Sequence, residues 1–158
     1  MSLSALRFKS KSFIFQYDIK EYNYTKKDKK MPKMFLLFSH KLTAQQIADA
    51  KESLGVEGFV RLPPKLQELW SDVPPDITDL ALYLQPIQQW LKEQVQSNDF
   101  VLVQGDFGAT CKFVTFVKEQ GAKAVYATTK RNVEERLLDG KVVKTSVFEH
   151  IRFREYKA

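Results

Sequence analysis

Polar residues that could bind an anion follow three apolar segments of the chain. Ser39-His40 ends the run that starts at Phe35, and Thr128-Thr129-Lys130-Arg131 ends the run that starts at Ala122. The third group, Gly105 to Thr110 (GDFGAT), follows the apolar residues from Val101. If the three runs are parallel strands, these groups meet at the carboxyl edge of one sheet, where ligands of open α/β folds bind.

The GDFGAT segment is the strongest of the three candidates. Gly105 and Gly108 permit a tight turn and close approach of a ligand, and the helix N-terminus behind them favours negative charge. Phe107, Ala109 and Thr110 complete the segment, with the Thr110 hydroxyl as a further donor. Asp106 repels phosphate, so its candidate roles are to cap the helix, orient a base or accept from a ribose hydroxyl. The spacing matches neither a Walker loop nor the dinucleotide fingerprint, and glycine serving turn geometry alone is the structural alternative.

His40 is the best candidate acid or base, because an imidazole exchanges protons near pH 7. Ser39 beside it could donate to an anion. Lys130 and Arg131 suit a phosphodiester, since Arg binds its oxygens bidentately and Lys supplies a point charge. A structural His40 and a solvated Lys130-Arg131 pair are the alternatives. His150 is a weaker acid or base, because it lies in the middle of an expected strand.

Cysteine and histidine usage gives no sign of a metal or another cofactor, because zinc-ligand spacing is absent. The single cysteine, Cys111, is predicted to be a small core residue, and Trp70 and Trp90 are predicted to pack in the core. One cysteine, no apolar run of about 20 residues and no signal-peptide pattern together predict a cytoplasmic protein.

The positive charge is concentrated at the start of the chain. Residues 1–33 hold nine Lys/Arg and three Asp/Glu, whereas the remainder balances at 16 against 16. We therefore expect a basic extension over 1–33 and a single domain over 34–158. The extension either touches nucleic acid or adds nothing to the fold.

Strands and helices are predicted to alternate through the domain. Strands are expected over 35–40, 58–63, 100–104 and 122–129, and helices over 43–55, 63–70, 78–95 and 109–120. Thr43 and Gln46 form a capping-box pattern, and Pro86 should kink or divide the helix that contains it. Asp139-Gly140 predicts a type I′ hairpin turn. The resulting fold class is a Rossmann-like α/β sandwich of about four parallel strands with an antiparallel hairpin at one edge.

The last strand is expected to alternate between two faces. Val147, Ile151 and Phe153 would share one face, and His150, Arg152 and Arg154 the other.

Four blocks of the sequence together resemble the small CRISPR-associated Csx-twenty family. They are MFLLFSHKLTAQQ, LPPKLQELWSDVPP, QGDFGAT and YATTKR, and the resemblance extends over about Met34 to Tyr156. It implies a CARF-like ring nuclease of type III CRISPR antiviral defence, a homodimer that cuts cyclic tetra-adenylate to linear di-adenylate. The basic residues 1–33 lie outside this resemblance.

The leading prediction is therefore a metal-independent phosphodiesterase in which a ribose 2′-OH attacks the adjacent phosphate. Lys130, Arg131 and the Gly105–Gly108 turn would hold phosphates, His40 would transfer the proton, and Ser39 and Thr110 would orient the ligand. One alternative is a non-catalytic cyclic oligoadenylate binder, a sponge or sensor. The other is an RNA-binding accessory protein that acts through residues 1–33. Membranes and duplex nucleic acid are not expected partners.

Overall fold

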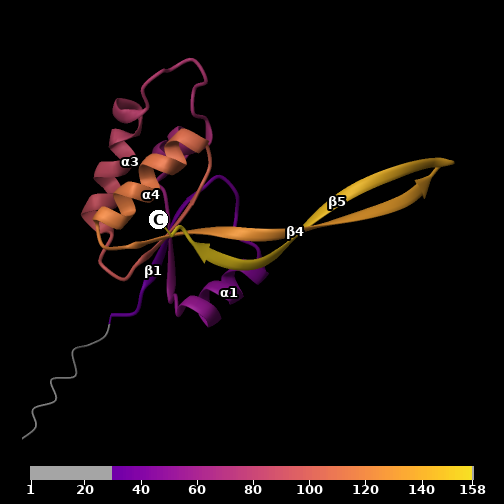
Figure 1. Ribbon diagram of the computed structural model, residues 1–158, viewed down its shortest axis with the longest axis horizontal. Helices are drawn as coiled ribbons and strands as arrows, with labels where there is room; N and C mark the ends of the chain where they lie inside the picture. The colour runs from indigo at the N-terminus through magenta and orange to yellow at the C-terminus, as the bar shows by residue number, and fades with distance from the viewer. Residues whose placement is uncertain (1–29, 158) are drawn as a thin grey trace, which may run out of the picture.

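The computed structural model describes residues 30–157 (Figure 1). They form one five-stranded sheet of order β2-β1-β3-β4-β5. The elements are β1 (Lys33–Phe38), α1 (Ala44–Leu54), β2 (Gly58–Arg61), α2 (Pro64–Ser71), α3 (Ala81–Gln94), β3 (Phe100–Gln104), α4 (Phe107–Glu119), β4 (Lys123–Leu138) and β5 (Lys141–Glu155). Nearly all of the basic extension expected over 1–33 lies outside the described residues. Among the described helices, none is long and apolar enough to cross a membrane.

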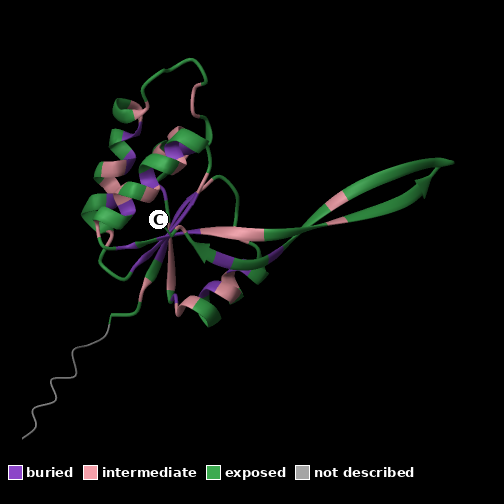
Figure 2. Ribbon diagram, in the orientation of Figure 1, coloured by how far each residue is buried: buried purple, intermediate pink, exposed green. Residues whose placement is uncertain are grey.

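The sheet confirms the predicted mixture of strand directions. β2, β1, β3 and β4 run parallel, and β5 is antiparallel to β4. Helix α1 packs on one face, whereas α2, α3 and α4 pack on the other. The alternating residues of β1 explain this sandwich: Phe35 and Leu37 join the cluster under α2–α4, and Met34 and Leu36 join the cluster under α1. The buried residues accordingly concentrate where the strands meet the helices (Figure 2).

Local signals place most helix ends correctly. The capping box at the start of α1 is present, with the Gln46 N–H donating to Thr43 Oγ1 (3.2 Å) and the Thr43 N–H donating to Gln46 Oε1 (2.9 Å). Gly55 ends the helix with φ of +68°, a conformation that glycine adopts without strain.

Helices α3 and α4 differ from the prediction at their starts. α3 begins at Ala81 rather than Thr78, and Pro86 does not divide it. Proline removes a single N–H, and the buried side chains of Leu84, Ile87 and Leu91 hold the helix on the core across that position. α4 begins two residues earlier than expected, at Phe107.

The β4–β5 hairpin extends well beyond the helices (Figure 1). Its second strand lies where the alternating residues after Gly140 predict it, whereas its first strand is longer than predicted. Its turn is as expected, because Asp139 (φ +49°) and Gly140 (φ +73°) have the two positive φ angles of a type I′ turn. The predicted strand end at Thr129 is wrong: β4 continues to Leu138 and pairs with β5 throughout. Lys130 and Arg131 therefore lie inside a strand.

A β-bulge in β5 corrects the expected distribution of its side chains. Thr128 pairs with Arg152 but Thr129 pairs with His150, so Ile151 is an extra residue without a partner. The bulge shifts the alternation by one residue. His150 consequently shares a face with Phe153, and their rings lie 4.9 Å apart. The prediction that His150 lies with Arg152 and Arg154 is wrong for this reason.

Candidate functional site

Two of the three predicted groups, Ser39-His40 and Gly105–Thr110, leave the sheet at its carboxyl edge beside a topological switch point, whereas Thr128–Arg131 lie within β4. β1 connects through α1 to β2 on one side, whereas β3 connects through α4 to β4 on the other, with the two helices on opposite faces. In open α/β sheets ligands bind outside the strand ends at such a point, and we call this region, bounded by Ser39-His40 and the start of α4, the crevice. Phe38 pairs with Gln104, so Ser39 and Gly105 leave adjacent strands side by side.

β3 and β4 separate beyond Leu102 and Val125, where their pairing ends. Side chains form hydrogen bonds with the backbone groups that lack a partner in the neighbouring strand there. The Tyr156 hydroxyl donates to the Val103 carbonyl (2.8 Å), and the Ala127 N–H donates to Gln104 Oε1 (2.9 Å). Burial, with smaller effects from Tyr126 and Cys111, raises the pKa of Tyr156, which keeps the phenol protonated as a donor. Nothing in the sequence pattern singles out Tyr156 or Gln104 for this role.

Asp106 is the N-cap of α4. Its Oδ1 accepts from the Ala109 N–H (2.9 Å), which is the first of the three roles considered for it. The carboxylate thus neutralises part of the helix terminus, while the N–H groups of Phe107 and Gly108, in the first turn, lack intrahelical acceptors.

Both glycines of the turn lie against neighbouring side chains. A Cβ on Gly105 would lie 3.0 Å from ring atoms of the buried Trp70, whose indole N–H donates to the Gln104 carbonyl (3.2 Å). A Cβ on Gly108 would lie 3.0 Å from the Leu80 side chain. The glycines let α4 and the turn pack against α2 and the segment before α3. These contacts support the alternative in which the glycines serve turn geometry and packing.

The start of α4 presents one aromatic ring to solvent. Phe107 is 90% exposed, whereas the next core-facing residue, Ala109, is buried. The Thr110 hydroxyl oxygen is also buried and has no hydrogen-bond partner among the described residues. Phe107 is therefore the side chain of this segment best placed to meet a ligand, and Thr110 would have to rotate to do so.

Ser39 and His40 are exposed in the connection that follows β1, which ends at Phe38. The His40 ring packs edge-on against Phe38, with centroids 5.4 Å apart. Gln67 of α2 holds this strand end by donating to the Phe38 carbonyl (3.2 Å). Within residues 30–157, no side chain hydrogen-bonds the His40 ring, so it is accessible but not oriented by a second group.

Lys130 and Arg131 lie where the hairpin leaves the body. Arg131 is about 10 Å further along β4 than Thr128 at the usual rise per residue. Successive side chains of a strand point to opposite faces, so the two cations do not share one face. Arg131 Nε donates to Ser146 Oγ (3.0 Å), and Lys130 pairs in register with Glu149. Thr128 lies closer to the crevice, with its hydroxyl donating to the Arg152 carbonyl (2.9 Å).

His150 is buried beside α1 and does not reach the crevice. Its side chain is 3% exposed, and Nε2 lies 2.8 Å from Asp49 Oδ2. Burial alone would raise the pKa of Asp49, but hydrogen bonds from Ser53, His150 and the Phe153 N–H together lower it below its ordinary value. The pair fastens the base of the hairpin to α1.

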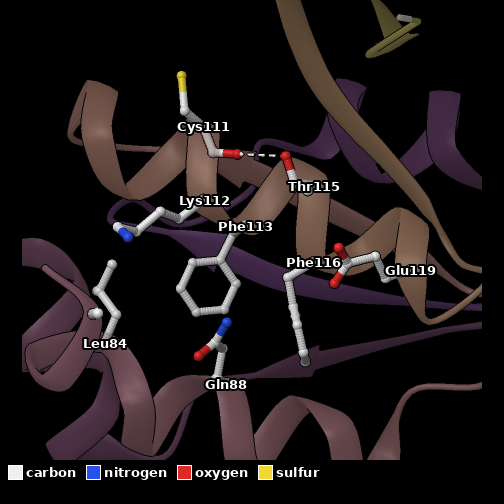
Figure 3. Close-up of a pocket in the computed structure, with 9 residues that line it drawn as sticks. Leu84, Gln88, Cys111, Lys112, Phe113, Thr115, Phe116 and Glu119 are labelled. Carbon is white, nitrogen blue, oxygen red and sulfur yellow. Dashed lines mark hydrogen bonds between the residues drawn. The ribbon is translucent and has the colours of Figure 1, made fainter.

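A separate hollow of about 420 Å³ lies between α3 and α4, where Phe113 points toward Leu84 and Gln88 (Figure 3). Cys111 borders it and is exposed, so the prediction of a core cysteine is wrong. The core face of α4 is set by Ala109, Phe113 and Val117, and Cys111 falls between them on the other side. No group of three or more possible metal ligands occurs among the described residues.

Comparison with known proteins identifies relatives over this same domain. The model of the Uncharacterized protein MJ1673 family matches residues 32–154. A relative from Methanocaldococcus jannaschii, named Uncharacterized protein MJ1673, is 52% identical over 126 residues, which are 80% of this chain and 98% of that protein. No solved structure matches the chain significantly.

Proposed function

We propose that this chain, which belongs to the Uncharacterized protein MJ1673 family, binds cyclic oligoadenylate at the carboxyl edge of its sheet and cleaves it as a ring nuclease. The observation that carries the proposal is the switch-point crevice, where Ser39-His40 and the start of α4 leave adjacent, in-register strands. The resemblance of the same blocks to the Csx-twenty family selects the ligand. The preferred substrate in this proposal is cyclic tetra-adenylate.

The crevice offers what a small cyclic polyanion needs. The exposed Phe107 ring is a platform on which an adenine can stack. The first-turn N–H groups of α4 can donate to a phosphate, as helix N-termini do in many anion sites. Lys130 or Arg131, at the base of the hairpin, would add a positive charge to the rim.

Cleavage by this route needs no metal. The ribose 2′-oxygen forms a bond to phosphorus as the bond from phosphorus to the 5′-oxygen breaks, which leaves a 2′,3′-cyclic phosphate and a 5′-hydroxyl. The first cut opens the ring and the second divides the linear molecule. Two cuts give two molecules of linear di-adenylate. His40 would take the 2′-OH proton or protonate the departing 5′-oxygen, with solvent exchanging the other proton, and Lys130 and Arg131 would stabilise the charge on the phosphate. The free Cys111 thiol suits a reducing compartment, so we place this activity in the cytoplasm.

The second candidate is a binder that holds the messenger without cutting it. It is favoured by one observation: the His40 ring has no orienting hydrogen bond within the described residues. Catalytic histidines are usually oriented by a second group. Binding of the ring ligand would in that case sequester it, and turnover would be absent.

Replacing His40 separates the two candidates. For the nuclease, His40→Ala lowers turnover of cyclic tetra-adenylate by about 10²–10⁴-fold and leaves its Kd nearly unchanged. Lys51→Ala, on the exposed far end of α1, is the matched control and keeps full turnover. Turnover equal to wild type in His40→Ala would remove this residue from the mechanism.

A further inference from the structure

The outer part of the β4–β5 hairpin, residues 132–148, is an arm that stands away from the body. No described helix covers it in Figure 1, and Figure 2 shows it almost entirely exposed. β4 pairs with β3 only from Lys123 to Val125, so both edges of the arm are free of other described strands. A two-stranded ribbon of this kind is marginally stable by itself in water.

The arm nevertheless exposes a set of large apolar side chains. Seven of them are 40–77% exposed: Val133, Leu137, Leu138, Val142, Val143, Val147 and Phe148. They divide between the two faces of the ribbon, with Val133, Leu137, Val142 and Phe148 on one face and Leu138, Val143 and Val147 on the other. Exposed apolar surface of this extent is typical of a binding site.

The charges of the arm identify the partner that fits it. Three acidic residues (Glu134, Glu135, Asp139) balance three basic ones (Arg136, Lys141, Lys144), so the arm has no net charge to attract nucleic acid. The cross-strand pair Glu135–Lys144 (2.7 Å) lies between the pairs Val133/Ser146 and Leu137/Val142 on one face. A copy turned about a two-fold axis can bring each Glu135 to the other arm's Lys144, as a self-complementary contact requires.

We propose that the arm is the dimerisation element of this protein, and that its apolar side chains pack against the arm of a second copy. The bulge at Ile151 twists the base of β5 and limits open-ended strand pairing at its free edge, which favours a closed dimer. The contact also fixes the bases of both arms, where Lys130 and Arg131 lie. If the protein has the proposed function, the Lys130 and Arg131 pairs of the two chains would flank one cyclic oligoadenylate.

Sedimentation of the full-length chain without ligand tests the contact. We expect wild type to sediment as two chains at about 100 µM, and Leu137→Glu/Val142→Glu to weaken dimerisation by about 100-fold or more. The matched control is Leu82→Glu, which charges an 81% exposed apolar residue of α3 outside the arm and leaves the dimer intact. A monomeric wild type, or an arm variant that dimerises like wild type, overturns the proposal.

Charge reversal covers the case in which the double variant fails to fold. Lys144→Glu alone should weaken the dimer, and Glu135→Lys/Lys144→Glu should restore it, because the pair is exchanged and not removed. Absence of this rescue in folded variants overturns the self-complementary contact. If wild type is a monomer and the amides of its arm exchange slowly with solvent, another part of the same chain covers the arm. That result also overturns the proposed dimer contact. Because no ligand is present, a dimer without nuclease turnover refutes only the proposed function.

Discussion

Asp106 affects both the stability of α4 and the affinity for an anion at its N-terminus, and its variants test the two effects separately. Its carboxylate caps α4 through the Ala109 N–H at 2.9 Å, yet it brings a negative charge to the place where we put a phosphate. Asp106→Asn keeps the accepting oxygen and removes the charge, since Asn and Asp are comparable N-caps. Asp106→Ala removes both. The pair of variants therefore separates capping from electrostatics.

The expected magnitudes differ for the two properties. Asp106→Ala should lower the free energy of unfolding by about 1 kcal/mol, whereas Asp106→Asn should leave it nearly unchanged. Two like charges some 5–7 Å apart repel by about 0.6–0.8 kcal/mol in water and by about 2.4–3.3 kcal/mol at the dielectric typical of a protein surface, so Asp106→Asn should tighten binding at least about threefold at low salt. The gain should shrink as salt is raised, because screening lengths fall to about 10 Å at 0.1 M.

Calorimetric titration with a non-cleaved cyclic tetra-adenylate analogue, together with urea unfolding of each variant, measures both effects. The reasoning would be refuted by an Asp106→Asn variant that is as stable as wild type but binds tenfold or more weakly. That result would mean that the carboxylate contacts the ligand directly, for instance by accepting from a ribose hydroxyl.

Three further predictions follow from particular contacts. Gly105→Ala should lower the free energy of unfolding in urea by about 1–3 kcal/mol, because its Cβ would lie 3.0 Å from Trp70. The control Gly58→Ala has open space around its Cβ and should stay within about 0.5 kcal/mol of wild type. Equal losses in the two variants would exclude the Trp70 contact as the cause. Phe107→Ala should weaken ring-ligand binding roughly 5–100-fold without changing stability, because the ring is 90% exposed, and unchanged Kd would exclude stacking. The folded pKa of Asp49 lies below its ordinary value of 3.8, so its ionised form adds stability that is present above that value and lost as the pH falls through the folded pKa. Asp49→Asn should be less stable at neutral pH and lack this acid-dependent loss, and parallel acid profiles of variant and wild type would contradict the assignment.

The sequence predicts features that depend on neighbouring residues well. The capping box at Thr43, the strand Phe100–Gln104 and the Asp139-Gly140 turn are confirmed because their signals lie within a few residues. The carboxyl-edge position of Ser39 and Gly105 could also be predicted, since parallel strands end at one edge.

Features that depend on distant partners could not be predicted in this way. Alternation in β5 does not reveal that Ile151 is an extra residue, and the bulge reverses the expected face of His150. The buried Asp49–His150 pair joins residues far apart in the chain. The polar residues after Thr129 predict a strand end at Lys130 and Arg131, whereas pairing with β5 continues the strand.

The central claim is that the crevice cleaves a cyclic oligoadenylate without a metal. The most direct measurement incubates the wild-type protein in excess with labelled cyclic tetra-adenylate, with and without EDTA, and resolves the products by chromatography. We expect linear di-adenylate to form at the same rate in both conditions. A ring that stays intact at excess protein, or cleavage that EDTA abolishes, would contradict it.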